Sequence, residues 1–188
     1  PIPFSFGEIK EKITITTNTP SKPSKEQIIN QAFKFHSQGN ISEAAKLYHY
    51  FISQGFKDHR VFSNYGLILK DLGKLKEAEM SLQKAIKLKP DDAMPHLNRG
   101  IIFSDLGKLQ EAELSYRKAI ELKPDSAESY YNLGNVLRDL GKLQEAFDSY
   151  LKVIDINPTL SNIYRSITIF LRDSDPSQLN KAKLKKIL

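Results

Sequence analysis

The sequence predicts an all-α fold, a solenoid of stacked antiparallel helix pairs with four full repeats and a partial fifth. The first observation is a nine-residue stretch, DLGKLKEAE, which starts at Asp71 and returns almost unchanged at Asp105 and Asp139, at intervals of 34 residues. The second is that each interval holds two stretches of apolar residues at helical spacing. The third is that one helix pair of this length cannot bury its apolar face alone, so neighbouring pairs must stack.

Four rows of 34 residues follow one another without insertions, over residues 25–58, 59–92, 93–126 and 127–160. Two columns of these rows hold only small residues, which lets the two helices of a pair approach closely: Ala32, Gly66, Gly100 and Gly134 in the eighth column, and Ala44, Ala78, Ala112 and Ala146 in the twentieth. Large side chains are expected to fill the space between the helices: Phe35, Leu69, Phe103 and Leu137 in one column, and Tyr48, Leu82, Tyr116 and Tyr150 in another.

Glycine and proline mark the expected helix ends. A glycine such as Gly107 closes the first helix of each pair, because glycine readily adopts the left-handed conformation of a helix end. A proline stops the second helix of the last three rows, at Pro90, Pro124 and Pro158.

This combination of small, aromatic and proline columns at a 34-residue period resembles the tetratricopeptide repeat, which implies a right-handed superhelical array. The resemblance covers residues 25–160. Row one departs from the family pattern, with Phe51 in place of alanine and Phe56 in place of proline, so we expect its second helix to end early, at Gly55.

The two ends of the chain differ from the repeats. Residues 161–171 are predicted to form the first helix of a fifth unit, and residues 175–188 a helix that caps the array, within a partial fifth repeat over 161–188. Because the helical pattern has no stop signal at the end, we expect the chain to be part of a longer protein. Residues 1–24 form an N-terminal extension that is expected to adhere to the array or to a neighbouring copy.

Composition restricts the classes of partner. No apolar run approaches the length of a membrane span, so no membrane partner is expected. The formal charge of +6 is concentrated in a C-terminal lysine cluster, not in a stripe with aromatic residues, which disfavours nucleic acid. The absence of cysteine excludes disulfides and thiol catalysis and fits a reducing compartment, so we expect a cytoplasmic location.

The first helices of stacked pairs line a concave surface, and the sixth column places asparagine on each of them: Asn30, Asn64, Asn98 and Asn132. A row of amides offers donors and acceptors to the backbone of an extended peptide. The alternative is that near-identical rows preserve an ancestral unit.

A second ladder lies two helical turns further on, formed by Asp71, Asp105 and Asp139. Carboxylates near helix C-termini oppose the helix dipole, so something must offset their charge. The candidates are the lysines three residues later, Lys74, Lys108 and Lys142, or a ligand.

Apolar contacts must supply most of the affinity, since four amides alone provide about 4 kcal/mol, which corresponds to millimolar binding. The predicted groove therefore also includes Phe33, Leu67, Leu97, Ile101 and Tyr131, with Asn135 and Arg138 as polar members. In the alternative reading, Phe33 packs under the N-terminal extension.

Paired asparagine and aspartate ladders resemble the repeat superhelix of the O-linked N-acetylglucosamine transferases, which implies that the asparagines hold a polypeptide. The favoured function is a module that binds a protein or peptide partner in its concave groove. One alternative is a targeting domain of a larger enzyme such as a transferase. Another is a scaffold that self-associates into a homo-oligomer through its N-terminal tail.

Catalysis is not expected. The four histidines fall in four different columns, and no pair has metal-ligand spacing. The GK of LGKL lacks the other residues of a phosphate-binding loop. We therefore expect no catalytic residue, no metal and no cofactor.

Overall fold

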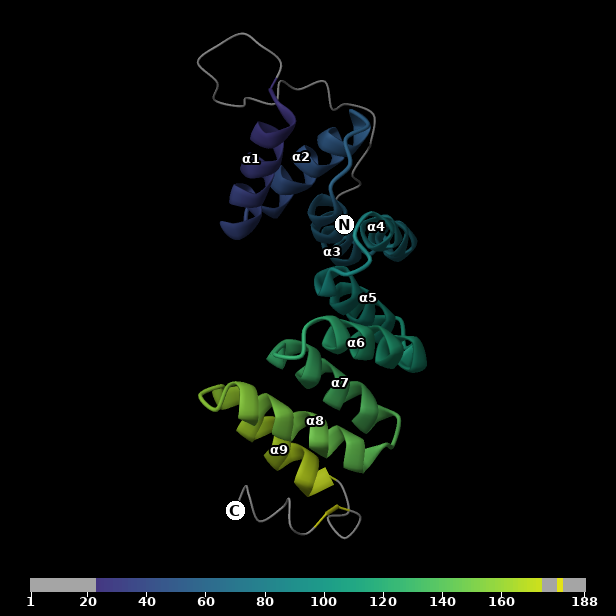
Figure 1. Ribbon diagram of the computed structural model, residues 1–188, viewed down its shortest axis with the longest axis vertical. Coiled ribbons are helices and arrows are strands. Elements are labelled where there is room, and N and C mark those ends of the chain that lie inside the picture. Colours follow the sequence, from purple (N-terminus) through teal and green to yellow (C-terminus); the bar gives the residue numbers. More distant parts are fainter. Residues whose placement is uncertain (1–22, 174–178, 181–188) are drawn as a thin grey trace. The chain divides into compact units, whose positions relative to one another are not determined.

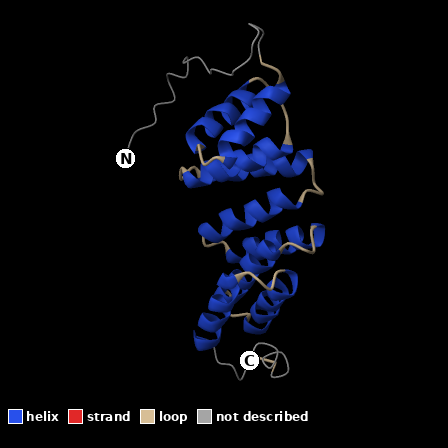
Figure 2. Cartoon of the chain, turned by 90° about the vertical axis from the view of Figure 1, so that its left-hand side faces the viewer, coloured by secondary structure: helices blue, strands red, loops and turns tan. Residues whose placement is uncertain are grey.

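The computed structural model describes residues 23–173 and 179–180. Within them it contains only helices and loops, as predicted (Figures 1 and 2). The helices are α1 (Lys25–Ser37), α2 (Ile41–Ser53), α3 (His59–Asp71), α4 (Leu75–Leu88), α5 (Ala93–Asp105), α6 (Leu109–Leu122), α7 (Ala127–Asp139), α8 (Leu143–Ile156) and α9 (Ser161–Asp173). Every odd-numbered helix begins at the first residue of a 34-residue row.

The chain divides into two compact units after Phe56, within the predicted array of four repeats. The N-terminal unit contains α1 and α2, and the C-terminal unit contains α3 to α9. Each unit is described by itself.

In the C-terminal unit each helix packs on the next, and α5 also contacts both α3 and α7 (Figure 1). This is a helical repeat solenoid. Its core runs along the whole unit, from Leu69 and Leu82 near its start to Ile163 and Phe170 of α9. None of the helices in the described ranges has both the length and the apolar character needed to span a membrane.

The small columns allow the close approach that the sequence predicts. A Cβ atom at Gly100 would lie 2.4 Å from the ring of Tyr116, and one at Gly134 would lie 2.6 Å from the ring of Tyr150. The tyrosines fill the space that a side chain on the neighbouring helix would need. Both helices of a pair are thereby held at the distance that glycine sets.

Helix ends follow from local chemistry. The side chain of Asp92 accepts a hydrogen bond from the amide of Met94 and caps α5. Gly107, at φ 70°, closes the same helix in the left-handed region, and its N–H donates to the carbonyl of Ser104. The predicted end of the first helix at glycine is therefore confirmed.

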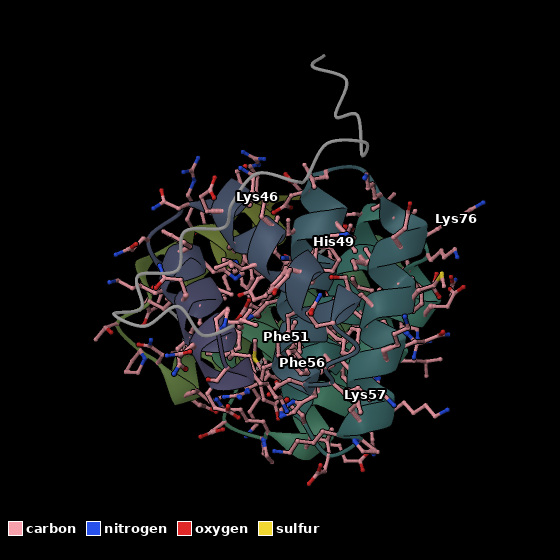
Figure 3. All side chains as sticks on the ribbon, turned by 90° about the horizontal axis from the view of Figure 1, so that it is seen from above. Lys46, His49, Phe51, Phe56, Lys57 and Lys76 are labelled. Atoms are coloured by element: carbon pink, nitrogen blue, oxygen red, sulfur yellow. The ribbon has the colours of Figure 1, made fainter. Side chains whose placement is uncertain are left out.

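The N-terminal unit shows the effect of the two phenylalanines of row one. Helix α2 ends at Ser53, one position earlier than α4, α6 and α8, which confirms the predicted early end. The rings of Phe51 and Phe56 contact each other with centroids 5.3 Å apart (Figure 3). Phe56 thus covers the buried Phe51 where other rows use proline to turn the chain.

Helix α9 confirms the first helix of the fifth unit. Its residues Ile163, Ile167 and Phe170 are buried, and Phe170 stacks on Phe147 of α8. Leu179 is also buried, and the amide of Asn180 donates to Gln144. Most of the predicted capping helix, at 174–178 and 181–188, lies outside the described residues, as do residues 1–22 of the N-terminal extension.

Candidate functional site

In the C-terminal unit the residues of the predicted groove lie on the odd-numbered helices α3, α5 and α7. We call the side of α3, α5, α7 and α9 that carries these residues and their hydrogen-bond partners the odd-helix face. Two hydrogen bonds on it each join one odd-numbered helix to the next. Asn98 of α5 donates to Ser63 of α3 at 2.9 Å, and Tyr131 of α7 bonds to Ser166 of α9 at 3.1 Å. In both, a sixth-column residue meets the fifth-column residue of the preceding repeat.

This contact distinguishes Asn98 from Asn132. Asn98 is only 2% exposed, because its amide is held by Ser63 between two helices. The expectation of an exposed amide at every position is therefore wrong at Asn98, which has a structural partner. Ser166 takes the asparagine position in the fifth unit and plays the same part with Tyr131.

Asn132 has a different neighbour. The preceding fifth-column residue is Leu97, a buried leucine that offers no hydrogen-bonding side chain. Asn132 is half-buried, and within residues 23–173 and 179–180 its side-chain amide has no hydrogen-bond partner. Its donors and acceptor are thus available on the odd-helix face.

The remaining asparagines are accessible to different degrees. Asn64 is half-buried in the C-terminal unit, and Asn30 is exposed on α1 of the N-terminal unit. The structure therefore brings Asn64, Asn98 and Asn132 together on the packed helices of one unit, while Asn30 belongs to the other.

The aspartate ladder is exposed and is paired with cations on the same face. Lys70 lies 3.2 Å from Asp71 and 3.3 Å from Asp105, and so joins α3 to α5. Burial works to lower the pKa of Lys70, but hydrogen bonds to the two carboxylates outweigh it and the pKa lies above its ordinary value. Asp139 pairs with Arg138 at 2.9 Å.

Two of the three lysines that the sequence suggested for this role have other partners. Lys142 instead donates to both carboxylate oxygens of Glu113, at 2.8 and 3.0 Å. Lys108 lies over the ring of Phe103, 5.6 Å from its centroid. Asp71 and Asp139 each form an ion pair with the residue directly before them, Lys70 and Arg138.

The apolar members of the predicted groove are also divided. Leu67, Ile101 and Tyr131 are half-buried and so reach the surface, whereas Leu97 is buried in the core. Phe33 is half-buried in the N-terminal unit, where its ring lies 6.0 Å from that of Tyr48.

Asn135 has an internal partner. Its side-chain oxygen accepts a hydrogen bond from the hydroxyl of Tyr150 at 2.9 Å. Burial raises the pKa of Tyr150 to about 12, so the hydroxyl keeps its proton and remains a donor at neutral pH. The side-chain oxygen of Asn135 is thus partly engaged within the protein.

A second concave feature was missed by the sequence reasoning. A hollow of about 470 Å³ lies among α6, α7 and α8, and it shares no residue with the predicted groove. Its apolar walls include Tyr130, Leu133 and Leu137, which the sequence pattern marks only as packing positions. We call it the α6–α8 hollow.

Charged side chains border this hollow. Arg117 bonds to Glu113 at 2.9 Å and to Glu145 at 2.6 Å, and Lys142 completes the network. Burial works to raise the pKa of Glu113, but hydrogen bonds from Lys142 and Arg117 outweigh it and hold the pKa below its ordinary value. The cations here are satisfied by carboxylates of the protein itself.

The described part of the chain contains no group of three or more histidine, aspartate or glutamate side chains that could bind a metal ion. His59 is instead paired with Asp92 at 2.7 Å, linking the starts of α3 and α5.

The fold and these faces define a helical-repeat protein. Family profiles described as TPR repeat match residues 66–107 and 102–137, and a tetratricopeptide repeat profile matches residues 127–160. Together the matches span half of the chain. The chain belongs to the tetratricopeptide repeat family.

Solved structures support the same fold. A crystal structure of MamA has a TM-score of 0.68 and 23% sequence identity over 86% of each chain. YrrB, described as a TPR protein with an unusual peptide-binding site, has a TM-score of 0.66 and 21% identity over 77% of this chain and 75% of its own. The first TPR of Spaghetti (RPAP3), bound to the HSP90 peptide SRMEEVD, has a TM-score of 0.58 and 23% identity over 61% of this chain and 90% of its own. A search of curated protein sequences gave no match.

Proposed function

We propose that the protein is a non-catalytic, cytoplasmic protein-interaction module that binds an extended segment of a protein partner on the odd-helix face. The observation that carries the proposal is Asn132, whose half-buried side-chain amide has no hydrogen-bond partner among the described residues. The equivalent amide one repeat earlier, that of Asn98, is bonded to Ser63. An amide in this state has lost part of its hydration without gaining a protein hydrogen bond.

The surroundings of Asn132 suit a peptide backbone. Half-buried Ile101 and Tyr131 provide apolar surface, and exposed carboxylates at Asp105 and Asp139 provide acceptors. A backbone presents alternating N–H and C=O groups, and an amide side chain can pair with both. Two relatives of the same fold have descriptions that mention peptide binding, YrrB and the first TPR of Spaghetti (RPAP3).

The experiment uses peptides selected from a random dodecapeptide display library against the whole chain. Their affinities are measured by fluorescence anisotropy for the wild type, for Asn132→Ala and for Gln83→Ala. Gln83 is the matched control, because it is an exposed amide on α4, an even-numbered helix. Loss of one net hydrogen bond predicts about fivefold weaker binding for Asn132→Ala and unchanged binding for Gln83→Ala.

Equal affinities for the wild type and Asn132→Ala would remove the asparagine column from the binding account. A loss at Gln83→Ala instead would move the peptide site to the even-numbered helices.

A further inference from the structure

Arg99 stands where the neighbouring repeats place a ring or an apolar side chain. One repeat later the equivalent residue is Leu133, which lines the α6–α8 hollow, and one repeat earlier it is Tyr65. Two other wall residues of that hollow, Tyr130 and Leu137, have earlier equivalents in His96 and Phe103. The corresponding place between α4 and α6 therefore contains an arginine and a histidine.

The guanidinium of Arg99 contacts an aromatic ring but has no carboxylate partner among the described residues. It lies over the ring of Phe103, 5.0 Å from the ring centroid. Its Nε is buried and has no hydrogen-bond partner. No carboxylate among residues 23–173 and 179–180 forms an ion pair with it, whereas Arg117 of the next hollow has two.

The charged groups that act on His96, next to Arg99, include a second cation, Lys118, and the carboxylate of Asp92. His96 is close enough to Arg99 and to Lys118 of α6 that both act on its charge. Burial, together with these two cations, holds the pKa of His96 below its ordinary value, although its hydrogen bond to the carbonyl of Pro90 and the charge of Asp92 act in the opposite direction. His96 is therefore neutral at pH 7. Lys118 pairs with Glu121 at 2.6 Å.

The charge balance selects the class of ligand. Lys108, which contacts the same Phe103 ring, is exposed to solvent, whereas Arg99 has a buried Nε and no ion pair within the described residues. One unmatched positive charge calls for one negative charge. A carboxylate fits the planar, two-pronged guanidinium with a pair of parallel hydrogen bonds.

We propose that the place between α4 and α6 around Arg99 binds the carboxylate of a glutamate or aspartate side chain of a protein partner. The site shares no residue with the odd-helix face, so it is a second contact point that does not depend on peptide binding there. It also gives a role to an arginine at a position where leucine packs in the next repeat.

The test is an NMR titration of the whole ¹⁵N-labelled chain with a capped Gly-Glu-Gly peptide at constant ionic strength. The neutral Gly-Gln-Gly peptide and inorganic phosphate are separate arms. The Arg99 Nε–H signal and the backbone amides of His96 and Phe103 are expected to shift and saturate with the glutamate peptide and to stay unchanged with the glutamine peptide.

Two variants make the test specific. Arg99→Leu introduces the residue of the next repeat and is expected to weaken the response of the His96 and Phe103 amides roughly tenfold. Arg117→Gln removes the same charge from α6, uses the residue that Gln83 places one repeat earlier, and is expected to keep the wild-type response. Arg99→Gln is the second variant if Arg99→Leu does not fold.

The proposal is overturned if the glutamine peptide shifts the same signals equally, or if Arg99→Leu and Arg117→Gln respond alike. A stronger response to phosphate than to the glutamate peptide would also overturn it, because the site would then be one for an inorganic anion. Asn132→Ala should leave the titration with the glutamate peptide unchanged. The test of the Arg99 site is therefore independent of the test of peptide binding on the odd-helix face.

Discussion

Asn98 is bonded and Asn132 is available because a single residue of the preceding repeat differs between them. Ser63 accepts the amide of Asn98, while Leu97 cannot accept that of Asn132. The two asparagines are identical in a column of the sequence and differ in their chemistry. The available one, Asn132, is where a ligand gains a hydrogen bond without breaking one.

This difference predicts unequal effects of the two alanine variants on stability. Asn98→Ala should lower the free energy of unfolding by about 1–3 kcal/mol, because it removes a buried hydrogen bond and leaves Ser63 without a partner. Asn132→Ala should change it by less than about 0.5 kcal/mol, as expected for a site without such a bond. Urea denaturation measures the free energy of unfolding of both variants. Equal losses of stability would contradict the assignment of Asn98 as bonded and Asn132 as available.

At the scale of the helix, the packing distance within a pair is set by one glycine and one ring. Gly100 on α5 faces the fully enclosed Tyr116 on α6, whose burial raises its pKa to about 12 and whose hydroxyl bonds to Ser104. The ring therefore has no free space into which it could move. In the preceding pair, Gly66 faces Leu82, and the nearest atom would lie 3.0 Å from a new Cβ.

These distances predict that alanine destabilises the chain more at Gly100 than at Gly66. Gly100→Ala should destabilise the chain by about 1–3 kcal/mol, because a methyl group 2.4 Å from the Tyr116 ring forces the two helices apart. Gly66→Ala should cost less, since its nearest contact, at 3.0 Å, requires a smaller shift and alanine gains about 1 kcal/mol of helix propensity over glycine. Thermal melts followed by circular dichroism compare the two, and a larger loss for Gly66→Ala would show that the packing is described wrongly.

The helices themselves were largely predictable from the sequence. Rows laid out from residue 25 begin where the odd-numbered helices begin, because the glycine and proline signals act locally. The early end of α2 also followed from a local departure, at Phe56 and Gly55. The division after Phe56 was not predicted, since the row pattern continues across it.

The sequence predicted which helices carry the candidate site, but not which of its side chains are bonded within the protein. The sequence places Asn98 and Asn132 in one column, but the residue that bonds to Asn98 lies 35 positions earlier, one repeat and one residue away. A search for hydroxyl residues in the fifth column, such as Ser63 and Tyr131, would have found this signal. The unmatched charge of Arg99 could not be found in this way, because it depends on which carboxylates reach it.

At the scale of the C-terminal unit, neighbouring repeats are joined by charge as well as by apolar contact. Glu113 of α6 takes hydrogen bonds from Lys142, at the start of α8, and from Arg117, which also reaches Glu145. This network connects the third and fourth repeats, and arrays of this kind depend on such nearest-neighbour contacts.

The network predicts a pH dependence. The folded-state pKa of Glu113 lies below its ordinary value, so its contribution is present above the unfolded-state pKa and is lost as the pH falls through the folded-state pKa. Glu113→Gln should cost about 1 kcal/mol at pH 7, a modest value because both cations are partly exposed to solvent. The cost should disappear in strong acid.

Urea unfolding of the wild type and Glu113→Gln at neutral and acidic pH measures this contribution. Glu111→Gln is the control, since it makes the same charge change on an exposed position of the same helix. A stability difference that stays constant with pH would show that the carboxylate of Glu113 does not act through its charge.

The central claim is that one face of the C-terminal unit offers a free amide at Asn132 and a closed one at Asn98. The most direct measurement is the pair of side-chain amide signals of these two residues in ¹⁵N spectra of the whole chain, recorded while a library-selected peptide is added. We predict that the Asn132 signals shift and saturate with the peptide while those of Asn98 stay in place. Unmoved Asn132 signals at saturation, with the peptide bound elsewhere, would contradict the account.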